Sequence, residues 1–286
     1  MNDLPMSIQK AAARYKPIET DGLTLYPILV KEYQEFLVAR SSLEVMQQSF
    51  PVALMRVPLL TALYQMDCEA ILNEEQPTGL FSRALLMLAL SLRLGEEQTI
   101  EERMRAFHVL IDRENPLVLQ RLVFYDADGQ EKEITPALFG KLRLIIAAQN
   151  GVKIESDTAN PDIVKAQQDM ASAGAINLDA NIDDWISAVS ALTGTAEEEI
   201  DDWPILKFQR RSDSFRRIID YIVCGVGECS GMVQWPKGNP CPHPFFAKVQ
   251  DGGGVLTAMG GTGYGSKPAP PKAGEAIRDF TRTITK

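Results

Sequence analysis

The segment LVLQRLVFYDADGQEKEITPALFGKLRLIIAAQNG, residues 117–151, contains the strongest local structural signals in the chain. Apolar residues flank an Asp-Ala-Asp-Gly turn and predict two antiparallel strands within residues 117–134. Thr135 followed by Pro136 is typical of a helix start, and Gly151 is typical of a helix end in the left-handed conformation. The segment therefore predicts a strand-turn-strand-helix unit.

A second hairpin is expected nearer the start of the chain. Asp21-Gly22 separates KPIET from LTLYPI, and this dipeptide accepts the positive φ angles of tight antiparallel turns. We therefore expect two short strands within residues 16–28.

Most of the remaining chain has helical periodicity. Thr99 precedes Glu102 by three residues, the spacing of a capping box that satisfies two backbone donors at a helix start. The residue that precedes or opens each expected helix is, in chain order, Tyr33, Pro58, Thr78, Thr99, Thr135, Asn160, Asn181, Thr195 and Pro204. The helix after Thr78 should end at Gly95 and, because its apolar residues run nearly all round, should be buried by several neighbours.

The helix that begins at Pro204 should extend to about residue 228 and bury one apolar face. Its expected buried residues are Leu206, Phe208, Phe215, Ile218, Ile219, Ile222 and Val223. The arginines of the same segment are expected mostly on the outside.

These elements predict an α+β fold that is predominantly α-helical. We expect a helix-rich body over residues 1–250 with two small β-hairpins, near residues 16–28 and 117–134. Residues 251–275 hold eight glycines and three prolines among few apolar residues. Such a composition buries too little surface to offset its ordering entropy, so residues 251–286 should be a flexible Gly/Pro-rich tail.

The net charge of −9 is concentrated in the middle of the sequence. Residues 61–203 carry 26 acidic and 11 basic side chains, whereas residues 204–286 carry 6 acidic and 12 basic ones. An acidic surface repels phosphate backbones, so nucleic-acid binding is not expected over most of the chain.

The sequence also predicts a cytosolic protein. The most apolar stretch, residues 80–94, is interrupted by Arg83 and Arg93 and falls short of the roughly 18 uncharged apolar residues of a membrane span. The first residues, MNDLPMSIQK, lack the features of a secretory signal. Four cysteines are too few for a disulfide scaffold in a chain of this length, and their thiols should stay reduced.

Enzymatic signals are weak. His108 and His243 are the two histidines; the first is expected inside a helix beside Phe107 and Leu110, and the second lies between prolines. The sequence shows neither a GxSxG nucleophile elbow nor a Cys-His catalytic signature. No catalytic or cofactor-binding residues are therefore expected.

Cys224, Cys229, Cys241 and His243 have the number of ligands that a zinc site requires but not its usual spacing. Their order is C-x4-C-x11-C-x-H, in which a single residue separates Cys241 from His243, whereas paired zinc ligands are normally separated by two to four residues. Free cysteines are also among the most commonly buried residues. We interpret these residues as packing residues, and no metal ligand is expected. Whether the four converge in space is left open by the sequence.

Three further segments invite a functional interpretation. GGTGYGSK, residues 260–267, lacks the order of a phosphate-binding loop and is interpreted as linker. RRSDSFRR, residues 210–217, is interpreted as the solvated face of a helix, with a phosphate or acidic partner as the alternative. EEEIDDW, residues 197–203, lacks a calcium-loop pattern and is interpreted as a helix start.

Five segments together resemble the tail assembly chaperones of long-tailed bacteriophages and prophages. They are LTLYPILVKEYQEF (residues 23–36), YDADGQEKEITPALFGKLRLIIAAQNG (residues 125–151), NPDIVKAQQDM (residues 160–170), WPILKFQRR (residues 203–211) and GMVQWPKGNPCPHPFF (residues 231–246). They span most of residues 16–250, and the Gly-rich tail lies outside the resemblance.

The resemblance implies a non-enzymatic protein in the cytoplasm of the bacterial host. Its implied partner is the tape measure protein, which it keeps soluble during tail assembly, with the tail tube protein as a further partner. The family has no active-site residues to carry over. Self-association is compatible with this role, whereas nucleic-acid and membrane binding are not expected.

Two alternatives are kept beside the chaperone interpretation. In the first, the chain is a structural tail or connector subunit that stays in the virion. In the second, it is an enzyme or metal-dependent regulator that uses the Cys/His series. Analysis of purified particles distinguishes the first alternative, and elemental analysis distinguishes the second.

Overall fold

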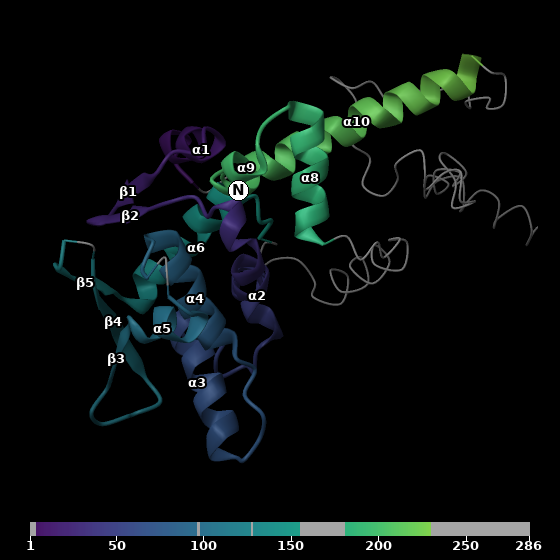
Figure 1. The fold of residues 1–286 in the computed structure, drawn as a ribbon. Coiled ribbons are helices and arrows are strands. Elements are labelled where there is room, and N and C mark those ends of the chain that lie inside the picture. Colours follow the sequence, from purple (N-terminus) through teal and green to yellow (C-terminus); the bar gives the residue numbers. More distant parts are fainter. Residues whose placement is uncertain (1–3, 96–97, 127, 155–180, 230–286) are drawn as a thin grey trace, which may run out of the picture. The chain divides into compact units, whose positions relative to one another are not determined.

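The structure is a computed structural model that describes residues 4–95, 98–126, 128–154 and 181–229. Over these residues the protein has a mostly helical α+β fold with two small antiparallel sheets (Figure 1). The α-helices are α1 Met6–Ala13, α2 Tyr33–Glu44, α3 Leu59–Leu72, α4 Leu80–Leu92, α5 Ile100–Arg105, α6 Pro136–Asn150, α8 Ile182–Thr193, α9 Glu197–Asp201 and α10 Ile205–Cys229. The 3-10 helices are η1 Val30–Glu32 and η2 Gln47–Ser49. The strands are β1 Ile18–Thr20, β2 Leu23–Leu25, β3 His108–Ile111, β4 Leu119–Tyr125 and β5 Glu131–Ile134.

The chain divides into two compact units. The first contains residues 1–165 and 181–210, and the second contains residues 166–180 and 211–286. The boundary falls within α10, and each unit is described by itself. The expected helix start at Asn160 and the expected body end and tail after residue 229 lie outside the described residues, so they stay predictions.

The N-terminal hairpin is confirmed. β1 and β2 pair in antiparallel register, with Thr20 opposite Leu23. The turn residues Asp21 and Gly22 have φ angles of 49° and 74°, the left-handed values that the Asp-Gly dipeptide predicted.

The last two residues of α6 hold this hairpin in place. The Gln149 side-chain amide donates to the Leu25 carbonyl at 3.1 Å, and the Asn150 side-chain oxygen accepts the Ile28 backbone N–H at 3.0 Å. Both side chains are fully buried, so these bonds satisfy backbone groups that water does not reach. α6 starts and ends as predicted, with Thr135 as N-cap and Gly151 in the left-handed conformation at its end.

The second sheet contains one strand more than expected. β4 pairs with β5 as predicted, but β3 pairs with the other edge of β4, giving the order β3-β4-β5. The prediction that His108 lies inside a helix is therefore wrong, because α5 ends at Arg105 and His108 opens β3, opposite Val123. The central strand of this sheet, β4, packs against α3 and α6.

The core of the first unit is built around α4. As predicted, this helix is buried nearly all round: Phe81 and all residues from Ala84 to Ser91 are buried. Its first turn is bound by Asp67 of α3, whose carboxylate accepts the backbone N–H groups of Gly79 at 3.0 Å and Phe81 at 3.1 Å. α2 and α3 both pack against α4.

Three predicted helix ends differ from the structure. The N-cap of α4 is Gly79 rather than Thr78, whose hydroxyl donates to Asp67 instead. The same helix ends at Leu92, before Gly95, because Arg93 already adopts a left-handed conformation. The N-cap of α9 is Ala196 rather than Thr195, whereas the Thr99–Glu102 capping box is confirmed.

Candidate functional site

The longest helix, α10, begins at a short backbone bridge to the N-terminal segment. Leu29 and Pro204 form an isolated antiparallel bridge. On either side of it, the Val30 N–H donates to the Trp203 carbonyl and the Ile205 N–H donates to the Ile28 carbonyl, both at 2.9 Å. The start of α10 is thereby fixed to a segment far away in sequence.

The first turns of α10 are buried as predicted. Leu206 and Phe208 are buried, and Ile205, which was not among the expected residues, is buried as well. A Cβ added to Gly151 would lie 2.9 Å from Leu206 Cδ1, below any normal contact distance. The φ angle of 71° and the close approach of α10 to the end of α6 both favour glycine at this position, because an added Cβ would displace the end of the Leu206 side chain.

In the part of the chain that the structure describes, the second half of α10 lacks the buried face that its sequence predicts. Val223, also expected on this face, is half-buried. Ile218, Ile219, Ile222 and Val226 are between 39% and 64% exposed, and Phe215 is half-buried. At 100° per residue these five side chains lie within about 100° of one another around the helix axis. We call these five residues the α10 stripe. The helical period was predicted correctly, but periodicity alone does not say what covers an apolar face.

The arginines of residues 210–217 are bound in several different ways. The Arg210 guanidinium donates to the Ala13 carbonyl at 3.0 Å and lies 5.5 Å from the centre of the Tyr15 ring. Arg216 forms an ion pair with Asp213 at 3.4 Å, and Arg217 donates to the Ser214 hydroxyl at 3.1 Å. Several of these guanidinium groups thus already bind neighbouring groups of the same chain. This favours the interpretation of residues 210–217 as a helix face over that of a dedicated phosphate site.

The acidic segment over residues 197–203 starts a helix, as predicted. Glu197, Glu198 and Glu199 occupy the first turn of α9, where carboxylates are stabilised by the helix dipole. Partial burial, followed by the charges of Asp202, Glu198, Asp183 and Glu197, raises the pKa of Asp201.

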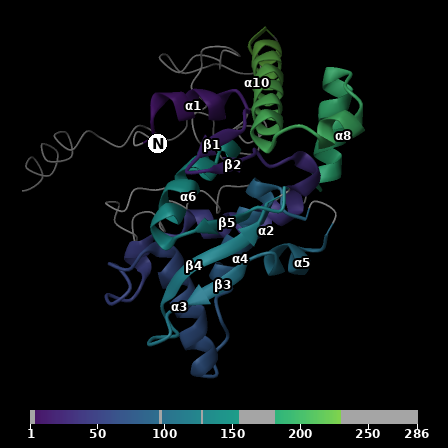
Figure 2. The same cartoon turned by 90° about the vertical axis from the view of Figure 1, so that its left-hand side faces the viewer.

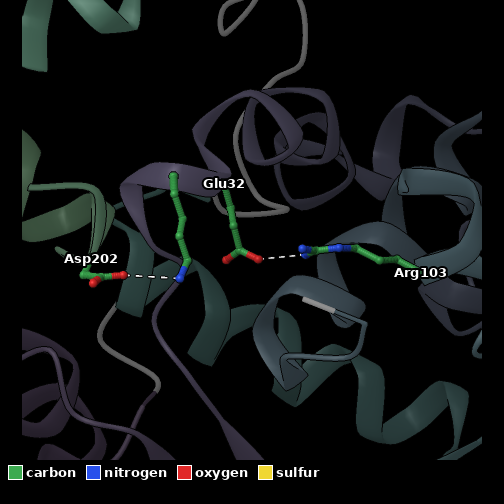
Figure 3. Close-up of polar contacts among 4 residues, drawn as sticks. Glu32, Arg103 and Asp202 are labelled. Atoms are coloured by element: carbon green, nitrogen blue, oxygen red, sulfur yellow. Dashed lines mark hydrogen bonds and ion pairs between the residues drawn. The ribbon is translucent and has the colours of Figure 1, made fainter. Parts of the chain in front are cut away.

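Two ion pairs lie side by side at the start of the first unit's α2, on neighbouring residues (Figure 3). Lys31 pairs with Asp202 at 3.2 Å, and both side chains are exposed. Glu32 pairs with Arg103 at 2.7 Å, and both of these side chains are more than nine-tenths buried. The sequence does not predict the buried pair, because nothing in the local pattern around either residue distinguishes a buried charge from an exposed one.

The candidate catalytic and metal-ligating residues are not brought together by the described part of the chain. His108 lies exposed on β3, with its ring 6.3 Å from that of Tyr125. Cys68, a free cysteine on α3, is half-buried. Across residues 4–95, 98–126, 128–154 and 181–229, no three His, Cys, Asp or Glu side chains are grouped closely enough to hold a metal ion.

Several candidate residues lie beyond what the structure describes. The side chains of Cys224 and Cys229 belong to this group, as do Cys241, His243 and the glycine-rich segment over residues 260–267. The absence of a metal site therefore stays a prediction for the Cys/His series. In the ranges where helices are described, none is both long and apolar enough to cross a membrane.

Comparison with known proteins gives no match: no family model, no curated protein and no solved structure is significantly similar to this chain.

Proposed function

We propose that this chain is a tail assembly chaperone of a long-tailed bacteriophage or prophage, which binds the tape measure protein and keeps it soluble. The observation that carries the proposal is the α10 stripe, an apolar helical face that is exposed along about three turns. The resemblance of the five segments named above is consistent with the same role.

The α10 stripe suits a helical partner with an apolar face of its own. An amphipathic helix places apolar residues at spacings of three and four, and a second helix with the same pattern can pack along it. Tape measure proteins, as the resemblance implies, are long and helix-prone, with repeated apolar stripes. The stripe of this chain would cover such a surface and prevent its aggregation.

The face of α10 opposite the stripe is polar and mixed in charge. Asp213, Arg216, Arg217 and Asp220 lie on that side, and Arg216 already pairs with Asp213. Binding should therefore depend mainly on apolar burial, which salt barely screens, rather than on the arginines.

Co-expression with the tape measure protein of the same phage or prophage tests the proposal. The tape measure protein should become soluble only with this chain present, and the complex should persist at roughly 0.5 M salt, where the Debye length is only a few ångströms. The double variant Ile219→Ser/Ile222→Ser should lose the complex, since each buried isoleucine contributes roughly 2 kcal/mol.

The matched control is Asp213→Ser/Arg216→Ser, which changes two residues on the opposite face of the same helix and should leave binding intact. If the tape measure protein stays insoluble, or if this chain is recovered in finished particles, the chaperone proposal fails. Recovery in particles would support the structural tail or connector subunit instead.

A further inference from the structure

β3 forms one edge of the three-stranded sheet, and its outer side has no backbone partner among the described residues. The sheet order places β4 in the middle (Figure 2). The backbone hydrogen bonds of the described residues join β3 to β4 alone. An open edge of this kind presents unpaired N–H and C=O groups that can pair with another strand.

The two edges of the sheet differ in chemistry. β5, the opposite edge, has the sequence Glu-Lys-Glu-Ile, and charged residues on an edge strand oppose pairing with a second strand. β3 has the sequence His-Val-Leu-Ile, which contains no carboxylate, lysine or arginine. Leu110 and Ile111 of this strand are each 39% exposed.

β3 also keeps the regular geometry that pairing requires. The register between β3 and β4 shifts at Leu110 and Ile111, which lie opposite Arg121 and Leu119. The extra residue of this bulge, Gln120, is therefore in the central strand and not in β3.

The hydrogen bond just beyond the end of β3 shows which backbone N–H and C=O groups of this strand point away from β4. The Asp112 N–H donates to the Val118 carbonyl at 2.9 Å, toward the β4 side. Successive residues of an antiparallel strand point their backbone groups to alternate sides, so those of Val109 and Ile111 point to the open edge.

We propose that two copies of this chain pair through β3 about a two-fold axis at Leu110, joining their sheets into one. In this register Val109 of each copy lies opposite Ile111 of the other. The N–H and C=O groups of these two residues in both copies, four N–H and four C=O groups in all, then hydrogen-bond to one another. The two Leu110 side chains face each other across the axis, in a non-hydrogen-bonded pair where side chains approach closely.

Polar complementarity favours a second copy as the occupant. With the axis at Leu110, His108 of each copy lies opposite Asp112 of the other, so an imidazole N–H can donate to a carboxylate at both ends of the paired strands. An open hollow of about 560 Å³ beside the edge, lined in part by Leu110 and Gln120, leaves room for side chains of the second copy. A second copy therefore supplies partners for the open backbone groups and for His108 and Asp112, with no segment from another protein.

Sedimentation velocity of the full-length chain over a range of concentrations tests the proposal. The wild-type chain should show a concentration-dependent monomer–dimer equilibrium. Leu110→Lys places two like charges opposite each other at the axis and should weaken dimerisation at least about tenfold. The control Leu37→Lys introduces the same charge at a leucine of α2 that is 42% exposed, and it should leave the dimer unchanged.

Cysteine cross-linking tests the register itself. Under mild oxidation Leu110→Cys should form a covalent dimer, because only a residue on the axis faces its own copy, whereas Leu37→Cys and the wild-type chain should not. His108→Cys should cross-link only in combination with Asp112→Cys. A chain that stays monomeric at all concentrations, a dimer that is insensitive to Leu110→Lys, or equal cross-linking of Leu110→Cys and Leu37→Cys would each overturn the proposal.

Discussion

The Glu32 carboxylate and the Arg103 guanidinium meet at 2.7 Å in the interior of the first unit, joining η1 to α5. The preceding residue, Lys31, makes its ion pair with Asp202 at the surface. Two adjacent residues thus form ion pairs, one buried and one exposed. Comparing them shows how burial changes the contribution of an ion pair to stability at the same place in the sequence.

Removing one partner of the buried pair should be strongly destabilising. Glu32→Ala leaves the Arg103 charge buried without its carboxylate, and we expect a loss of about 3–5 kcal/mol in the free energy of unfolding. Lys31→Ala should cost less than about 1 kcal/mol, because an exposed ion pair is well screened by water. Urea denaturation measures both, and similar losses for the two variants would contradict the assignment of Glu32 as buried.

The Asp67 side chain should contribute measurably as the cap of α4. Asp67→Ala removes the acceptor of the Gly79 and Phe81 N–H groups, and we expect a loss of about 2 kcal/mol in the free energy of unfolding. Asp67→Asn keeps one of the two oxygens and should give an intermediate loss. Equal stability of the alanine and asparagine variants would contradict this prediction, because it would mean that the oxygen retained by asparagine contributes nothing.

Two glycines at helix ends allow the contact with α10 to be isolated. Gly151 and Gly194 both end a helix with φ near 70°, but an added Cβ at Gly194 meets no atom within 4 Å. Gly194→Ala should therefore cost about 1 kcal/mol for the left-handed backbone alone. Gly151→Ala should cost at least about 1 kcal/mol more, because the buried Leu206 side chain has little room to move away. Equal losses in thermal or urea unfolding would mean that α10 approaches α6 less closely than described.

The raised pKa of Asp201 predicts a pH-dependent effect on stability. Because the folded state binds this proton more tightly than the unfolded state does, the favourable contribution is present at low pH and is lost as the pH rises through the folded pKa. At neutral pH the ionised carboxylate opposes folding, so Asp201→Asn should raise the melting temperature at pH 7. The gain should disappear below about pH 3.5, where the carboxyl group of the wild-type chain is itself neutral.

Asp184→Asn is the matched control for this prediction. It removes the same charge from the first turn of α8, where a carboxylate is stabilised by the helix dipole, and should lower the melting temperature slightly at pH 7. An increase of similar size in both variants would point to net charge rather than to the surroundings of Asp201.

Local signals in the sequence predicted most of the elements correctly. Asp21-Gly22, the Thr99–Glu102 capping box and Thr135-Pro136 each act within a few residues, so their structural meaning does not depend on the rest of the chain. β3 was missed for the opposite reason. The four residues of β3 follow a short helix, and they form a strand because β4, which comes later in the chain, supplies their hydrogen-bond partners.

The candidate surfaces were harder to predict than the elements. The spacing of Ile218, Ile219 and Ile222 gave the correct helical face, but burial depends on whether another element covers that face. The Glu32–Arg103 pair shows the same limit, since the two residues are brought together by packing of distant segments. Sequence periodicity therefore located the α10 stripe without indicating that it is exposed.

The bridge between Leu29 and Pro204 also determines when the protein can finish folding as it is made. The ribosome releases the N-terminal hairpin early, but residues 203–205, which pair with residues 28–30, are synthesised much later. At 5–20 residues per second, roughly 10–35 s separate the two segments. During that interval the nascent chain exposes the apolar surface that Ile205 and Phe208 later cover. A protein proposed to protect another chain from aggregation is therefore itself prone to aggregate while it is being synthesised.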